Sequence, residues 1–383
     1  MVVVTSSFQT TTTGAAPLPQ APVSSTLSLL EHVNFNIPNH EYSLDFYLDV
    51  LGFGLDPRVA VNLMPDSAAQ FGREGLIWVS CGPNQIHLPR CCRDEDETAQ
   101  RLYGHIGLRY ASLQGLQTRL ANAPHTSGPN FDEPCWEWYN LVYTEEEEDE
   151  TAHGVPSEIH IQDRYGNVFH CKPGVTKQTR YQQPVVQQSD VDTFGDVALR
   201  YGVGETNTSE CLGIDYLEFE CQVHTAAKIA NFYEVIFNAT TTTVVVPPPS
   251  ILAGTKTEEE PPTTVAYISI GNIDPTTHEA EQYLIFRETC DHVPPTDGHH
   301  IALYLGSTQH ETDEHDFARA FHQAQHRGLL STNWRDTVAV FEWDTAQAEC
   351  QFRIHDIVDV DTGDLLFQLE HELRSIHHPT WPG

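Results

Sequence analysis

The chain has 383 residues, enough for two or more domains that each bury a hydrophobic core. It carries 20 lysine and arginine residues against 54 aspartate and glutamate residues, a formal net charge of −34. This charge repels phosphate backbones and anionic membrane surfaces, so we expect no nucleic-acid partner and no membrane partner. No apolar run approaches the roughly 20 residues that span a bilayer, so we expect a soluble protein.

Nine cysteines, an odd number without C-x-x-C spacing, resemble neither a disulfide framework nor a zinc ribbon. We therefore expect the cytoplasm or another reducing intracellular compartment. The adjacent Cys91 and Cys92 could form a redox pair or bind a soft metal, but two loop thiols are the simpler interpretation. Residues 1–26 have no charged side chain and no secretion or import pattern, so we expect a disordered tail.

The first strong strand pattern covers residues 30–37. Side chains alternate between the two faces of a strand, so Glu31 is expected on one face with Val33, Phe35 and Ile37. His32 and the following asparagines then share the other face. Such a polar face either meets water or lines a space that holds a ligand.

The strongest organisational signal is a repeated order of one strand, one helix and three strands. Opening strands are expected at 30–37, 104–110, 213–220 and 298–305, and helices at 39–51, 113–120, 226–237 and 316–327. The remaining expected strands are 54–60, 75–80, 85–89, 136–144, 156–163, 168–171, 265–270, 282–288, 350–356 and 365–372. This order predicts an α+β fold of four βαβββ units.

We expect neighbouring units to pair into two domains. The first would span 27–175, with units at 27–90 and 102–175, and the second would span 211–375, with units at 211–290 and 297–375. Residues 176–210 have little hydrophobic periodicity and are expected to form a linker between the domains.

Several segments resemble the vicinal oxygen chelate superfamily, which includes glyoxalase I, extradiol dioxygenases and bleomycin-resistance proteins. They are Leu30-Glu31-His32-Val33, Leu44-Asp45-Phe46-Tyr47-Leu48-Asp49-Val50-Leu51-Gly52, Gly104-His105-Ile106-Gly107 and Asp163-Arg164-Tyr165-Gly166-Asn167. The resemblance implies that two units pair so that their curved mixed sheets form a cup with the helices outside. It also implies that the metal ligands lie on the first and last strand of each unit.

Carried onto this sequence, the resemblance implies a metal site made by His32, His87, His105 and His170. Four neutral imidazoles suit a divalent transition metal, such as zinc, ferrous iron, nickel or copper, better than magnesium or calcium. The resemblance to glyoxalase I and to the dioxygenases would imply a carboxylate ligand at one or more of these four positions. All four are histidine in this sequence. Glu158 and His160, on an adjoining strand, are the candidate catalytic groups for proton transfer.

The second half resembles the superfamily less closely. Its equivalent positions are Tyr216, Arg287, His300 and Phe367, with Glu370 or His371 as a ligand only if the last strand is shifted. Tyr216, Arg287 and His300 are the candidate substrate-binding residues, because a guanidinium and an imidazole both donate hydrogen bonds to carboxylates. An equally open alternative is a supporting domain with no site of its own.

The first functional hypothesis is a metal-dependent enzyme of the vicinal oxygen chelate superfamily that acts on a small oxygenated organic molecule, in the manner of a glyoxalase or dioxygenase. The alternative is a protein of the bleomycin-resistance type, which binds or sequesters a small ligand without catalysis. The third hypothesis is a scaffold protein in which side chains fill both cups, so that neither binds a ligand. The oligomeric state is left open by the sequence.

Overall fold

A computed structural model describes residues 23–38, 40–55, 76–89, 99–122, 135–143, 155–175, 209–247, 262–306, 313–333 and 338–381. Most of the expected tail, most of the expected linker, and Cys91 and Cys92 lie outside these residues, so those expectations stay predictions. Within the described part of the chain, no helix is both long and apolar enough to cross a bilayer.

Each of the four units contains a strand, a helical segment and three further strands in that order, the last of which lies parallel to the first, and unit 4 has a second helix between its strands. Unit 1 contains β2 (Leu27–Asn34), α1 (His40–Leu44), the π-helix η1 (Asp45–Val50), β3 (Gly54–Leu55), β4 (Leu76–Cys81) and β5 (Asn84–Pro89). Unit 2 contains β6 (Gly104–Tyr110), α4 (Gln114–Asn122), β7 (Trp136–Val142), β8 (Glu158–Asp163) and β9 (Val168–Pro173). The first two units therefore follow the predicted order closely.

The second half repeats this order. Unit 3 contains β10 (Cys211–Gln222), α7 (Ala226–Phe237), β11 (Thr241–Val246), β12 (Thr263–Ile273) and β13 (Ala280–Thr289). Unit 4 contains β14 (His300–Leu305), α8 (Asp313–His326), β15 (Leu330–Ser331), α9 (Trp343–Glu349), β16 (Gln351–Val358) and β17 (Leu365–Ser375). A short strand before unit 1, β1 (Val23–Ser24), pairs with β12.

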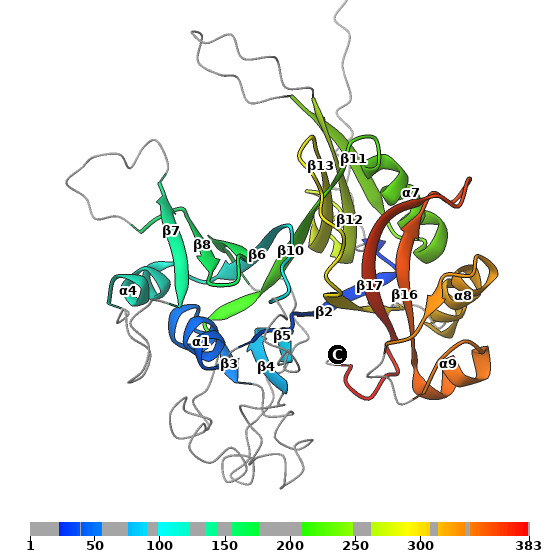
Figure 1. Cartoon of the computed structure of the whole chain (residues 1–383), viewed down its shortest axis with the longest axis horizontal. Helices are drawn as coiled ribbons and strands as arrows, with labels where there is room; N and C mark the ends of the chain where they lie inside the picture. Colours follow the sequence, from blue (N-terminus) through cyan, green and yellow to red (C-terminus); the bar gives the residue numbers. More distant parts are fainter. Residues whose placement is uncertain are drawn as a thin grey trace, which may run out of the picture.

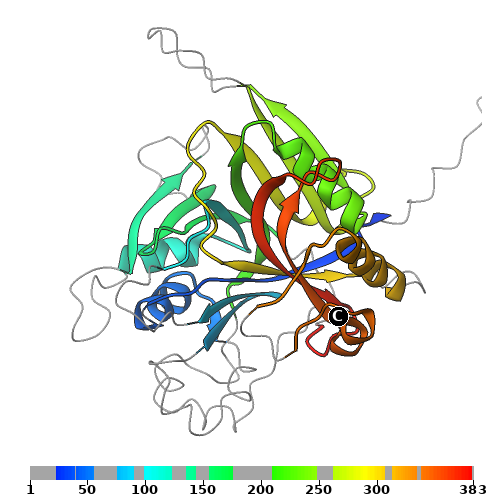
Figure 2. The ribbon, with the colours of Figure 1, turned by 45° about the vertical axis from the view of Figure 1, so that its right-hand side comes forward.

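The four units form two sheets, each built from two units whose opening strands pair antiparallel. Units 1 and 4 form an eight-stranded sheet in the order β15-β16-β17-β14-β2-β5-β4-β3. Units 2 and 3 form a nine-stranded sheet in the order β1-β12-β13-β10-β6-β9-β8-β7, with β11 beside β12. Figure 2 shows blue β2 reaching the side of the molecule that holds the strands of unit 4, where it pairs with β14. The predicted α+β class, with four βαβββ units paired in two sheets, is confirmed.

The pairing differs from the expected one, because unit 1 shares its sheet with unit 4 rather than with unit 2. Units 1 and 2 contact each other through their helices instead, as do units 3 and 4, with the helices of units 1 and 2 on one side of the molecule and those of units 3 and 4 on the other (Figure 1). Nε of Arg119 on α4, for example, donates a hydrogen bond to the carbonyl oxygen of Val50 at 2.8 Å. The repeat in the sequence shows that there are four similar units. Because their opening strands offer similar edges for pairing, the repeat does not show which two units share a sheet.

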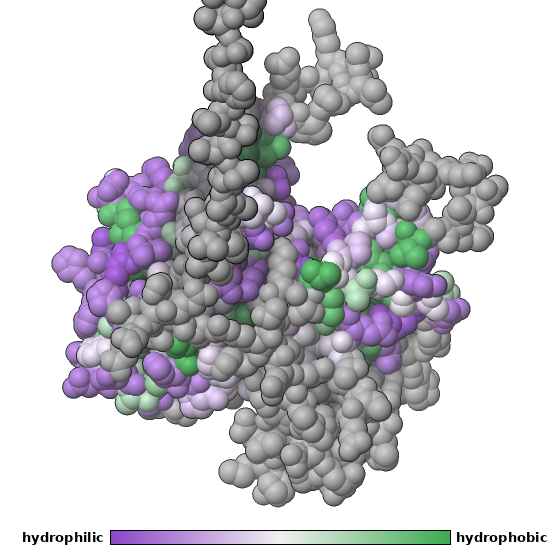
Figure 3. Space-filling view, turned by 180° about the vertical axis from the view of Figure 1, so that it is seen from behind, coloured by the Kyte–Doolittle hydropathy of each residue, from purple (hydrophilic) through white to green (hydrophobic). Residues whose placement is uncertain are grey.

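The two sheets and their helices enclose one continuous cluster of buried hydrophobic side chains. The coloured, described residues on the face seen in Figure 3 are mostly hydrophilic, with small separate hydrophobic patches among them. A buried polar cluster within sheet 1/4, the sheet of units 1 and 4, is therefore an exception that calls for a reason.

Candidate metal centre

A β-bulge in β2 shapes the polar cluster of sheet 1/4. His32 lies opposite Ala302 of β14 and Leu30 lies opposite Leu303, so Glu31 has no strand partner. A bulge of this kind breaks the alternation of side chains between the two faces. The carboxylate of Glu31 consequently lies on the side of His32, with Oε2 3.1 Å from Nδ1 of the imidazole. The expected position of Glu31 on the face of Val33 is therefore wrong.

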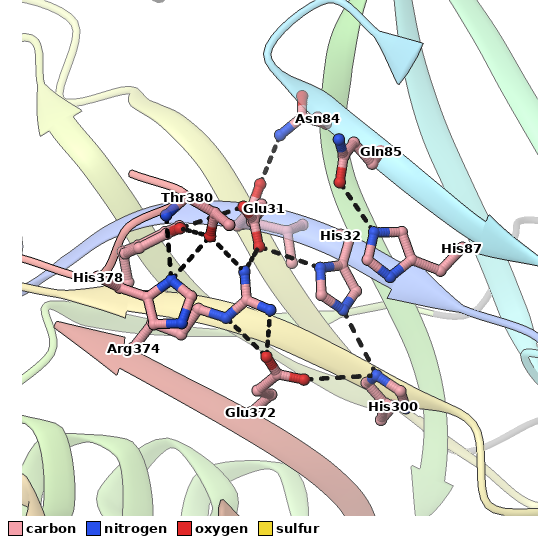
Figure 4. A network of polar contacts seen from close by, with 12 residues as sticks. Glu31, His32, Asn84, Gln85, His87, His300, Glu372, Arg374, His378 and Thr380 are labelled. Carbon is pink, nitrogen blue, oxygen red and sulfur yellow. Dashed lines mark hydrogen bonds and ion pairs between the residues drawn. The ribbon is translucent and has the colours of Figure 1, made fainter. Parts of the chain in front are cut away.

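Three adjacent strands place His32, Ala302 and Glu372 in one row across the sheet. Ala302 of β14 is opposite His32 on one side and opposite Glu372 of β17 on the other. His300 lies two residues before Ala302 and so projects from the same face of β14. Because alanine has only a methyl group, the space between the two longer side chains stays open to the His300 ring. Figure 4 shows His32, His300 and Glu372 turned toward one another.

These three residues, named the His32 cluster from here on, bring their ligand atoms together. Nε2 of His32 lies 3.4 Å from Nε2 of His300, which lies 3.8 Å from Oε2 of Glu372. One ligand atom from each residue lies within 4.8 Å of the other two, and all three residues are buried. The two rings meet at 74°, so their in-plane lone pairs can converge on one point. Two imidazoles and a carboxylate form a donor set that suits a divalent transition metal.

Glu31 fixes the orientation of the His32 ring. An ionised carboxylate has no proton to donate, so Nδ1 of His32 donates the hydrogen bond to Glu31. In the neutral ring the lone pair is then on Nε2, the nitrogen that faces His300. A carboxylate behind a histidine is the usual outer partner of a metal-binding imidazole.

A buried ion-pair network surrounds the His32 cluster. Arg374 contacts both Glu31 and Glu372, and Arg353 bridges Glu372 to Glu370 at 2.7 and 2.9 Å. Burial alone would raise the pKa of Glu31, but the Arg374 charge and the His32 hydrogen bond lower it to about 2. The pKa of Glu372 is also lowered, because Arg374 and Arg353 outweigh the effect of burial. Three carboxylates against two guanidinium groups leave one net negative charge in this network, which favours a cation beside it.

His87, expected to be a ligand, lies next to the cluster in another orientation. Its ring is stacked on that of His32 at 3.7 Å and 20°, and on that of Trp78 at 4.3 Å and 5°. Lone pairs of stacked rings run side by side and do not converge on one ion. Nε2 of His87 lies 2.8 Å from Oε1 of Gln85, so the amide holds the ring in this stack. The geometry therefore places His87 beside the ligand set.

The other two expected metal ligands lie in sheet 2/3, the sheet of units 2 and 3. The rings of His105 and His170 are stacked at 3.8 Å, and the ring of His160 is stacked on His170 at 3.8 Å and 11°. Nε2 of His160 lies 2.9 Å from Oε1 of Glu158. Burial lowers the pKa of His105, and it lowers the pKa of His170 to about 3, so both rings are neutral near pH 7.

Glu158, His160 and His170 form a second group whose ligand atoms lie within 4.8 Å of one another. Its parallel rings do not direct their lone pairs at one point, however, and a ring would have to rotate to bind an ion. Glu158 and His160 do lie beside His105 and His170, as the sequence suggested. Their role in proton transfer stays a prediction.

The position in sheet 2/3 that corresponds to His32 is taken by Tyr216. Tyr216 follows a similar bulge in β10 and lies opposite Gly107, which corresponds to Ala302. The Tyr216 ring covers Gly107 so closely that a β-carbon there would overlap it. Its hydroxyl oxygen lies 3.4 Å from Nδ1 of His170. A phenol ring therefore fills the space that stays open over Ala302 in the other sheet.

Two expected groupings are corrected by this arrangement. His32 and His87 lie in one sheet and His105 and His170 in the other, so the four histidines do not converge on one ion. Among the substrate-binding candidates, His300 belongs to sheet 1/4 whereas Tyr216 and Arg287 belong to sheet 2/3. Arg287 is paired with Glu218 through two hydrogen bonds of 2.7 and 3.0 Å. Both differences follow from the pairing of unit 1 with unit 4.

The sequence interpretation missed Glu372, since it placed Phe367 at the ligand position of the last strand. A signal was present, because Glu370, Glu372 and Arg374 alternate along β17 on one face of a strand that packs in the core. Charged side chains on a buried strand face must be paired with other charged or polar groups. Such buried clusters are often functional sites.

No protein-family model and no curated protein matches the sequence. Among solved structures, the chain is similar to glyoxalase I from Zea mays, with 9% identity, 90% of this chain and 92% of that chain covered, and a TM-score of 0.47. It is also similar to a putative dioxygenase from Bacillus subtilis, with 12% identity, 91% and 85% coverage and a TM-score of 0.43. A third similarity, to the fosfomycin resistance protein FosX from Listeria monocytogenes, covers 42% of this chain and 90% of that chain at 15% identity and a TM-score of 0.23.

Proposed function

We propose that the chain is a metal-dependent enzyme of the vicinal oxygen chelate type that acts on a small oxygenated organic molecule. The observation that carries this proposal is the convergence of His32, His300 and Glu372 from three adjacent strands in a buried cluster. A three-residue set leaves coordination positions for substrate, whereas four protein ligands would close a tetrahedral site. The donor set of two histidines and one carboxylate is that of non-haem ferrous oxygenases, so dioxygenase-like chemistry is favoured over the glyoxalase reaction.

In this proposal His32, His300 and Glu372 hold a divalent transition metal, which acts as a Lewis acid or as the site of dioxygen chemistry when bound. Glu31 keeps the His32 lone pair directed at the cluster. Arg353 and Arg374 hold the Glu372 carboxylate ionised and in place.

The proposal is tested by titrating metal-stripped protein with Fe²⁺, Mn²⁺, Ni²⁺ and Zn²⁺ and then adding catechol, which offers two neighbouring oxygen atoms. We expect catechol to bind only to the metal-loaded protein, and oxygen uptake to follow with the active metal. An Ala302→Leu variant should lose both responses although it keeps every ligand, because the longer side chain fills the space between His32 and Glu372. A matched Leu303→Met variant, on the opposite face of β14, should retain them.

Catechol binding that is equal with and without metal, and that survives Ala302→Leu, would contradict the enzyme proposal. That result would favour the alternative of a protein that sequesters small ligands without catalysis. Metal-dependent catechol binding without turnover by any of the four metals would leave the metal centre in place and remove catechol-like substrates and dioxygenase chemistry from the proposal.

A further inference from the structure

A short turn follows β17 and packs against the outer partners of the proposed metal centre. The backbone N–H of His378 donates to the carbonyl oxygen of Ser375 at 2.9 Å, and that of Trp381 donates to the carbonyl oxygen of His378 at 2.9 Å. The Trp381 ring meets the buried ring of Tyr304 edge to face, with 4.7 Å between centroids and 65° between planes. We name residues 376–381 the C-terminal turn.

The hydroxyl group of Thr380 is the point where the C-terminal turn meets the buried ion-pair network. Its oxygen, Oγ1, lies 2.8 Å from Nη1 of Arg374, 2.7 Å from the hydroxyl oxygen of Tyr304 and 2.8 Å from Nδ1 of His378. A guanidinium group can only donate, so Oγ1 of Thr380 accepts the hydrogen bond from Arg374. Figure 4 shows Thr380 beside His378, Arg374 and Glu31.

The Tyr304 hydroxyl connects Thr380 to Glu31. It donates its single hydrogen to Oε1 of Glu31 at 3.1 Å, because an ionised carboxylate can only accept. Burial and the Glu31 charge raise the pKa of Tyr304, so the phenol keeps this hydrogen at neutral pH. The Tyr304 oxygen is then the acceptor in the 2.7 Å contact with Thr380, and the threonine hydroxyl is the donor.

Arg374 connects the same threonine to the proposed ligand Glu372. Nε of Arg374 donates to Oε1 of Glu372 at 2.6 Å, and its Nη1 contacts both Oε2 of Glu31 and Oγ1 of Thr380. Oε2 of Glu31 also accepts the hydrogen bond from Nδ1 of His32. One hydroxyl group therefore bridges the groups that hold two of the three proposed ligands.

We propose that Thr380 is a positioning residue of the metal centre, which acts by holding Tyr304 and Arg374 in the places where they fix the two carboxylates. This inference rests on the proposed function, because it requires an ion at the His32 cluster. Loss of the hydroxyl would leave a donor of Arg374 and an acceptor of Tyr304 without this partner inside a buried network. Groups that orient metal ligands from behind set the affinity of the site, so the loss should reach the ion.

Replacement of Thr380 by Val tests the proposal, because it removes the hydroxyl and keeps the shape of the side chain. Competition with a chromophoric chelator on the full chain measures the affinity for Co²⁺. We expect a loss of about 3- to 10-fold, smaller than the roughly 10- to 100-fold that follows loss of a direct outer partner, with a changed visible absorption of the bound Co²⁺. Thr380→Ser should restore both, and Thr242→Val, at an exposed position of β11, should change neither.

A second variant tests whether the C-terminal turn carries this effect. Trp381→Ala removes the ring that packs on Tyr304 and should also lower the Co²⁺ affinity. Adding Thr380→Val to it should cause little further loss, whereas independent effects would multiply.

The inference is overturned if the wild type binds Co²⁺ and folded Thr380→Val protein binds it with the same affinity and absorption spectrum. It is also overturned if Thr380→Ser is as impaired as Thr380→Val, or if the losses in the double variant multiply. A wild type that binds no metal would instead overturn the metal centre itself, and this inference with it.

Discussion

The carboxylate of Glu31 lies 3.1 Å from Nδ1 of the His32 imidazole, although strand alternation would place these neighbouring residues on opposite faces. The bulge that leaves Glu31 without a strand partner on β14 makes this contact possible. Glu31 therefore acts on the candidate metal centre through His32, by fixing the nitrogen that carries the lone pair, and through Arg374, which it shares with Glu372.

Replacement of Glu31 by Gln should weaken metal binding without removing a ligand. The amide keeps the size of the side chain but loses the negative charge that accepts the hydrogen bond from Nδ1 of His32. Loss of such an outer partner typically reduces metal affinity about 10- to 100-fold. Competition with a chromophoric chelator measures the change. Glu279→Gln, at an exposed position, is the matched control and should bind metal as the wild type does.

Replacement of Arg374 by Met should destabilise sheet 1/4, because the guanidinium group is the shared partner of two buried carboxylates. Removing one side of a buried ion pair costs about 3–5 kcal/mol in the free energy of unfolding. Urea unfolding of metal-free protein checks this value. Lys228→Met removes an ion pair with Asp359 in which the lysine side chain is 55% exposed, so it should shift the unfolding midpoint much less than Arg374→Met. Equal midpoints for the two variants would mean that the Arg374 network adds nothing to stability.

Acid should destabilise the metal-free protein partly through Glu31. Its pKa is lowered from 4.5 to about 2, so the folded state stays ionised at a pH where the unfolded state takes up a proton. The resulting stability is complete above about pH 4.5 and is lost as the pH falls toward 2, about 3 kcal/mol in all. Between pH 6 and pH 3, urea unfolding of the wild type should therefore lose about 2 kcal/mol more than that of Glu31→Gln. Parallel losses in the two proteins would show that Glu31 is not the group responsible.

The repeat in the sequence was sufficient to predict the four units, because most of their strands and helices are specified by local periodicity, although β15 and α9 were not predicted. Helix α7, for instance, has the predicted bounds 226–237. Local periodicity could not predict which units share a sheet. That choice depends on the pairing of β2 with β14 and of β6 with β10, and the strands of each pair are more than 100 residues apart in the sequence. His32 was identified from its place on the opening strand, but its partners came from an unexpected unit.

Glu372 was missed for a related reason. Glu372 on β17 becomes a candidate ligand through the register of three strands, in which Ala302 separates it from His32. A bulge changes such a register by one residue without a clear mark in the sequence, as Glu31 illustrates. The roles of Tyr216 and Arg287 were equally hard to assign, because neighbouring side chains, the His170 ring and the Glu218 carboxylate, already engage them.

Metal content of the purified variants tests the central claim, that His32, His300 and Glu372 bind one ion while the stacked histidines of sheet 2/3 bind none. Elemental analysis after metal loading and desalting at neutral pH should give about one ion per chain for the wild type and for His105→Ala. The same measurement on His300→Ala and Glu372→Gln should give almost none. Full metal content in His300→Ala together with loss in His105→Ala would contradict the account.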